Sequence, residues 1–94
     1  MEPIYTHKGD DFTVQVFKNR VDWTKKGFLF EPSVTQTIFS QDIAEVQISG
    51  SGVLTRAKFS LITKDGRNFS FEYIAGGKNE VSMLRNMILN IVPA

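Results

Sequence analysis

Apolar and polar positions alternate with a period of two along most of the chain, the pattern of β-strands with one buried face. The alternation is clear over residues 12–17 and repeats over residues 20–25, after Lys18-Asn19. Asn tolerates a positive φ, which suits a tight turn between antiparallel strands. We therefore expect a hairpin here. The side chains expected to point into the core are those of Val14, Val16, Val21 and Trp23.

The same period predicts further strands after this hairpin. Residues 34–40 and 43–49 are rich in β-branched side chains and flank a turn at Gln41-Asp42. Residues 57–63 and 68–73 alternate on either side of Asp65-Gly66, a strong hairpin signal. Residues 3–7 are either a short first strand or a tail. The expected buried positions of the later strands are Ala44, Val46, Ile48, Phe59, Leu61, Phe69, Phe71 and Tyr73.

The period changes to that of a helix near the end of the sequence, over residues 79–92. One apolar stripe is formed by Val81, Leu84, Ile88 and Ile91, with Met87 beside it. Asn79 is the expected N-cap, and Glu80 places negative charge at the positive end of the helix dipole. A helix of this length is marginal alone, so its stripe is expected to pack on the strands.

Length and composition narrow the class of protein. Ninety-four residues form one domain, 1–94, with its core over about residues 9–92. With 11 basic and 10 acidic residues the net charge is +1, which makes nucleic acid an unlikely partner. The chain has no Cys, so disulfides and thiolate chemistry are excluded. It shows no signal peptide and no apolar run of membrane-spanning length, so we expect a cytoplasmic protein.

Three stretches resemble the bacterial pleckstrin-homology-like (PH-like) domains. They are TIFSQDIAEV at 37–46, VFKNRVDW at 16–23 and FSLITKDG at 59–66. The resemblance implies a partly open barrel of two near-orthogonal sheets, closed at one end by the helix. Such domains serve mainly as scaffolds that bind peptides, proteins or lipid head groups, without enzymatic activity, and the resemblance transfers no functional residue. We therefore expect a mainly β fold, a β-barrel plus one α-helix, with six to seven antiparallel strands and a C-terminal capping helix.

The apolar triplet Phe28-Leu29-Phe30 has two interpretations. If it belongs to a strand, one or two of the rings complete the core, which suits a small domain that needs its aromatic residues. If Gly27 and Pro32 hold it out of the sheet, three large apolar side chains beside Lys25-Lys26 form a contact for a protein partner or a membrane surface. The core interpretation is the favoured one from the sequence.

Basic residues suggest a second kind of site. Lys18, Arg20, Lys25 and Lys26 resemble the basic pattern on the first strands of phosphoinositide-binding domains. Phosphate binding needs several convergent donors, and solvated strand ends explain the same residues. An anionic head-group site is therefore the alternative function, with solvated charges as the simpler interpretation.

No catalytic, cofactor or metal site is expected. His7 is the single histidine, and a polar position in a turn explains it better than a metal site shared with Asp10 and Asp11. The carboxylates fall on different strands, so none forms an acid-base pair. Gly76-Gly77 lacks the continuation of a phosphate-binding loop, and the loop 49–56 is expected to connect the two sheets.

The function expected from the sequence is binding rather than catalysis. The leading hypothesis is an interaction module that binds a protein partner, or another copy of itself, through strand edges or the groove between helix and sheet. The alternative is a module that binds a membrane surface or an anionic head group. A third hypothesis is a small inhibitor of a larger enzyme, encoded by a mobile element.

Overall fold

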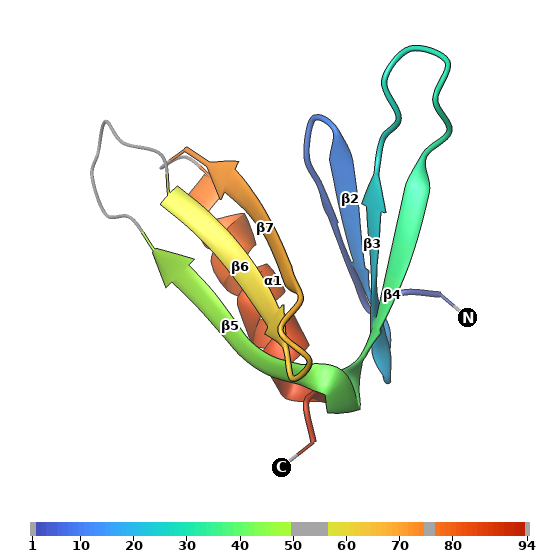
Figure 1. The fold of residues 1–94 in the computed structure, drawn as a ribbon. Coiled ribbons are helices and arrows are strands. Elements are labelled where there is room, and N and C mark those ends of the chain that lie inside the picture. Colours follow the sequence, from blue (N-terminus) through green and yellow to red (C-terminus); the bar gives the residue numbers. More distant parts are fainter. Residues whose placement is uncertain (1, 50–56, 75–76, 94) are drawn as a thin grey trace.

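The computed structural model describes residues 2–49, 57–74 and 77–93. Within these residues the chain forms seven strands followed by one α-helix (Figure 1). The strands are β1 (Tyr5–Lys8), β2 (Phe12–Val16), β3 (Arg20–Lys25), β4 (Val34–Phe39), β5 (Ile43–Ser49), β6 (Ala57–Thr63) and β7 (Asn68–Tyr73). A short 3-10 turn, η1 (Ser40–Asp42), joins β4 to β5, and the helix α1 spans Lys78–Ile91. The mainly β class with a C-terminal helix is confirmed.

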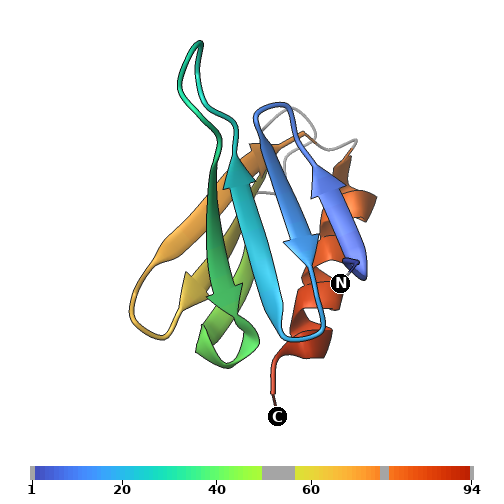
Figure 2. The same ribbon diagram turned by 90° about the vertical axis from the view of Figure 1, so that its right-hand side faces the viewer.

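The strands form two antiparallel sheets, ordered β1-β2-β3-β4 and β5-β6-β7. Neighbours in each sheet are neighbours in the chain, so both sheets are simple meanders. Their strands run at an angle to each other, and α1 lies beside the second sheet and the β1 side of the first (Figures 1 and 2). The expected barrel is not closed, because no strand pairing among the described residues joins the two sheets.

The first predicted hairpin is confirmed, including its inward face. Val14 pairs with Trp23 and Val16 with Val21. All four side chains are buried. Residues 3–7 contain the short strand β1 rather than a tail, with Tyr5 opposite Val16.

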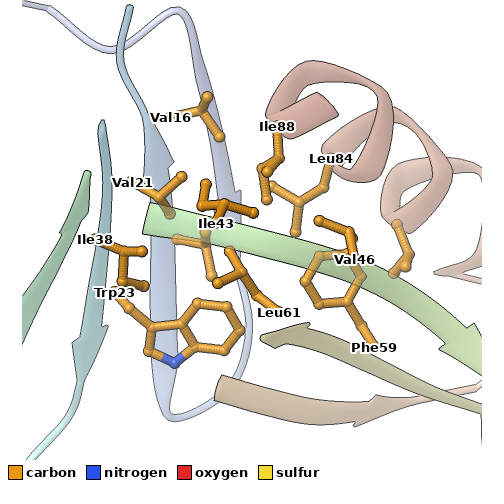
Figure 3. Close-up of a cluster of buried hydrophobic side chains, with 12 residues drawn as sticks. Val16, Val21, Trp23, Ile38, Ile43, Val46, Phe59, Leu61, Leu84 and Ile88 are labelled. Carbon is orange, nitrogen blue, oxygen red and sulfur yellow. The ribbon is translucent and has the colours of Figure 1, made fainter. Parts of the chain in front are cut away.

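A core of twelve buried side chains joins both sheets to the helix (Figure 3). The first sheet contributes Val14, Val16, Val21, Trp23 and Ile38; the second contributes Ile43, Val46, Phe59 and Leu61; and α1 contributes Val81, Leu84 and Ile88. Phe69, Phe71, Tyr73, Met87 and Ile91 pack against this core from its margins, as their spacing predicts. Most of the apolar residues thus serve one interior.

The expected inward position of Ala44 is wrong. Its side chain is exposed, whereas the preceding Ile43 is buried. The pairing of β5 with β6 shifts register between Ile43 and Glu45. An extra residue on one strand reverses the alternation on either side of it, so Ile43 and Val46 both reach the core.

The helix begins earlier than the predicted cap. Its N-cap is Gly77 rather than Asn79, and no side chain caps the first turn. Glu80 lies in that first turn, as expected from the helix dipole. The hydroxyl of Tyr5 donates a hydrogen bond of 3.2 Å to the carbonyl oxygen of Glu80, which fixes the start of α1 to the edge strand β1.

The turn between β6 and β7 is the tight turn that Asp65-Gly66 predicts. Gly66 has a φ of 91°, a conformation that other residues adopt only at a cost. The Nε of Arg67 donates to Asp65 at 3.2 and 3.1 Å, and the hydroxyl of Thr63 also donates to Asp65. Side chains as well as backbone therefore close this turn.

Candidate functional site

The segment between β3 and β4 extends well beyond the ends of its strands (Figures 1 and 2). At its base, the amide of Lys26 donates a 2.8 Å hydrogen bond to the carbonyl oxygen of Asp11 in the β1–β2 loop. At its tip, the amide of Glu31 donates a 3.1 Å bond to the carbonyl oxygen of Phe28, which closes a turn. Backbone hydrogen bonds at both levels therefore give this projection a defined shape.

Gly27 is required by this shape. A Cβ atom there would overlap the carbonyl group of Glu31 and lie 2.6 Å from the carbonyl oxygen of Pro32. The two sides of the projecting loop approach each other closely enough at this point to exclude a side chain. The sequence anticipated that Gly27 and Pro32 bracket the segment, but not that their backbones pack against each other.

Leu29, at the tip, has a φ of 58° and is the described non-glycine residue with a positive φ. For a residue with a Cβ atom, this left-handed conformation is about 1–2 kcal/mol less stable than the right-handed one. Strained backbone of this kind is concentrated at functional sites. Here the strain accompanies the exposure of a large apolar side chain.

Phe28, Leu29 and Phe30, named together the apolar loop, are exposed to solvent by 75%, 80% and 102%. The favoured interpretation of these residues as core is therefore wrong, and the alternative, a triplet held out of the sheet, is confirmed. The core is filled without them because Trp23, Phe59 and their neighbours occupy the interior. Exposed apolar area continues from the loop to Val34, the first residue of β4, which is 57% exposed.

Two hollows lie near the apolar loop: Phe28 and Leu29 line one of them, and the other shares Lys25 with it. The inter-sheet groove, of about 290 Å³, lies between the first sheet and β7 and is lined by Trp23, Lys25, Val34, Gln36, Asn68, Phe69 and Ser70. The second, of about 410 Å³, lies beside the loop itself and is lined by Asp10, Asp11, Lys25, Lys26, Gly27, Phe28 and Leu29. The ring centroids of Trp23 and Phe69 are 5.7 Å apart, so aromatic rings from both sheets meet at the groove.

Gln36 and Val34 were not anticipated as site residues. The signal that was available is the absence of any charged residue from Val34 to Ser40, which is unusual for an exposed strand.

The structure does not bring the four candidate anion-binding residues together. Lys18 lies in the turn before β3 and Arg20 is the first residue of β3, whereas Lys25 is its last residue and Lys26 follows it. At about 3.3 Å per residue the two pairs are roughly 17 Å apart. A single phosphate group cannot contact both pairs.

Other residues also lie near Arg20, Lys25 and Lys26. The guanidinium of Arg20 lies 4.1 Å from the ring centroid of Phe17, and its Nε lies 3.5 Å from Oδ1 of Asp22. Lys25 and Lys26 line one hollow together with the acidic residues Asp10 and Asp11. Neither pair therefore presents an isolated positive patch.

His7 is a strand residue rather than the expected turn residue. It is buried in β1, where its ring packs against those of Phe12 and Phe71, at centroid distances of 5.8 and 5.2 Å. Burial lowers the pKa of His7, and the nearby charge of Glu80 opposes this shift in part. Among the described residues no group of three metal-binding side chains comes together.

Two smaller predictions concern residues that lie outside the described part of the chain. They are the connecting role of the loop 49–56, of which Ser49 alone is described, and the Gly76 half of the glycine pair before α1. Within the described part of the chain, no helix has the length and apolar content to cross a bilayer.

The fold and the apolar loop define a small, mainly β domain of two antiparallel sheets and one C-terminal helix. Comparison of the chain with protein-family models, with curated proteins and with solved structures finds no match.

Proposed function

We propose that this chain is a non-enzymatic interaction module of PH-like architecture that binds a protein partner through the apolar loop and the adjoining inter-sheet groove. One observation carries the proposal: Phe28, Leu29 and Phe30 are presented to solvent on a structured projection. Clusters of exposed large apolar side chains mark interaction surfaces in small proteins.

The construction of the loop supports a binding role. Gly27 permits the close backbone approach at its base, and Leu29 holds a strained conformation at its tip. Aromatic anchors with little conformational freedom are the residues that contribute most to protein interfaces. The adjoining groove offers polar side chains, such as Gln36 and Asn68, to a bound chain.

The two-sheet arrangement with a helix packed on it supports the PH-like assignment. Both meanders and the order of elements agree with the resemblance in three stretches of sequence. Architecture alone does not select a ligand, so the loop and groove carry the functional argument.

The test compares tagged wild-type protein with the double variant Phe28→Gln/Phe30→Gln as bait in extract of the native host. The matched control is Met83→Gln/Leu89→Gln, which removes two exposed apolar side chains from the outer side of α1. We expect the loop variant to lose proteins that the wild type and the helix control both retain. Identical retention by all three would contradict the proposal, provided that circular dichroism shows each to be folded.

Binding to a membrane surface is tested separately, with the wild-type protein. Vesicles of phosphatidylcholine with and without phosphatidylserine are sedimented with the wild-type protein at low salt. Salt-sensitive binding that requires phosphatidylserine would favour the head-group alternative over a protein partner. We expect none, because Asp10 and Asp11 lie beside Lys25 and Lys26.

A further inference from the structure

The edges of the two sheets are not protected equally. An edge strand presents unpaired backbone groups, and proteins usually block it with charge, a bulge, shortness or a covering element. In the first sheet, β1 has four residues, and its Tyr5 is bonded to α1. In the second, β5 carries a register shift, and β7 carries the charged residue Glu72.

The remaining edge strand, β4, has none of these protections. Its sequence, Val-Thr-Gln-Thr-Ile-Phe, contains no charge, no proline and no glycine. It is six residues long and pairs with β3 in unbroken register. Five of its six side chains are exposed, and among the described residues β3 is the one strand paired with it.

We propose that β4 pairs antiparallel with β4 of a second copy of this chain, which joins two four-stranded sheets into one continuous sheet. This dimer rests on the proposed function of the chain as an interaction module, and a second copy of the chain is one of its protein partners. Pairing between identical charged strands would place like charges in proximity. A strand without charge escapes that penalty, and the near-symmetric order Val34-Thr35-Gln36-Thr37-Ile38 makes β4 complementary to itself, which favours a second copy as the occupant.

The geometry of a continuous sheet restricts the register. Side chains directly opposite each other in an antiparallel pair point to the same face, and a two-fold axis perpendicular to the sheet keeps the two core faces on one side. Each residue must therefore lie opposite itself or opposite a residue an even number of positions away.

Among the registers that satisfy this rule, the one centred on Gln36 pairs side chains of the same type with each other. It places Gln36 opposite Gln36, Val34 opposite Ile38, and Thr35 opposite Thr37 of the second copy. A register centred on Thr37 instead places Gln36 opposite Ile38 and Thr35 opposite Phe39. Matched β-branched and threonine pairs stabilise sheets, so the Gln36-centred register is the one proposed.

The first test measures mass in solution by light scattering over a concentration series. We expect the wild-type mass to rise toward twice the 10.6 kDa of one chain. Gln36→Lys places two ammonium groups opposite each other and is expected to raise the dimer dissociation constant about tenfold or more. The matched control is Gln47→Lys, on the exposed face of the edge strand β5, which leaves the dimer intact.

The second test uses the absence of cysteine from the chain. Under mild oxidation Gln36→Cys should form a disulfide-linked dimer faster than Thr37→Cys, because the proposed register sets Gln36 against itself at a distance that a disulfide spans. Gln47→Cys is the control and should remain largely unlinked. Faster linkage through Thr37→Cys would overturn the register.

A strictly monomeric wild type at all concentrations would overturn the inference as a whole. The proposed function fails separately, when Phe28→Gln/Phe30→Gln retains every partner of the wild type. Circular dichroism must show that each variant is folded, so that a loss of binding is not caused by unfolding.

Discussion

The imidazole of His7 in the first sheet stacks on the ring of Phe71 in the second, with centroids 5.2 Å apart and planes inclined by 22°. This contact crosses between two sheets that share no strand pairing among the described residues. Phe12 joins it, at 4.5 Å from Phe71. An ionisable residue is thus part of the aromatic layer that holds the sheets together.

The first prediction concerns pH. Burial lowers the pKa of His7 below its ordinary 6.5, so the unfolded chain binds a proton more readily than the folded one. The free energy of unfolding should therefore be highest above pH 6.5 and should fall as the pH drops through 6.5 toward the folded pKa. Denaturant unfolding between pH 7.5 and 5, compared with His7→Phe, measures this. Equal pH dependence in both proteins would contradict the prediction.

The second prediction separates the two sides of α1. Leu84 is fully buried, whereas Leu89 is 41% exposed. Leu84→Ala should lower the free energy of unfolding by about 2–5 kcal/mol, because it removes contacts and leaves a cavity. Leu89→Ala, the control, should cost less than about 1 kcal/mol. Equal losses, measured by urea unfolding, would mean that the helix packs differently from the structure.

The third prediction concerns the strain at the loop tip. Leu29→Gly removes the cost of a positive φ of 58° and should raise the free energy of unfolding by up to about 1 kcal/mol. Phe28→Gly, the neighbouring control, relieves no such strain and should lower it, since glycine gains freedom in the unfolded chain. Thermal unfolding of the two variants reports the sign. Changes of the same sign would argue against strain at Leu29.

The fourth prediction concerns the β6–β7 turn. Hydrogen bonds from Thr63, and then from Arg67, lower the pKa of Asp65. The stability that this carboxylate contributes is present above its unfolded pKa and is lost as the pH falls through its folded pKa, below the window of His7. Thr63→Val should raise the pKa of Asp65 in an NMR titration, because the larger cause is removed. An unchanged pKa would assign the shift to Arg67 instead.

The periodicity of apolar residues predicted which side chains of the first hairpin and of the helix face the core. The hairpin with Val14 and Trp23 inward, and the helix stripe with Val81 and Ile88 inward, follow from side-chain spacing, since a slip of one residue would expose the core. Ala44 was misplaced because a bulge resets alternation without any mark in the hydrophobic pattern. The predicted helix start was wrong because the N-cap is Gly77. A glycine has no side chain to accept a capping hydrogen bond, so the usual sequence signal for a cap is missing.

The candidate site was less predictable than the fold. The exposure of Phe28 and Phe30 accompanies a close backbone approach between Gly27 and Glu31, whereas the sequence showed only that Gly27 and Pro32 flank the segment. The separation of Arg20 from Lys25 follows from a straight strand between them and could have been inferred from its length. The burial of His7 depends on its position opposite Val14 in β2, a relation set by register.

The sequential order of strands in both sheets has a kinetic consequence. Each strand pairs with the one that precedes or follows it in the chain, so most backbone pairing closes short loops. Closing a short loop costs little chain entropy, so each hairpin can form locally. All seven described strands precede α1 in the chain, so a nascent chain can form its hairpins before the helix is synthesised. Until then Leu84 and Ile88 do not cover the interior, which stays accessible to chaperones and proteases.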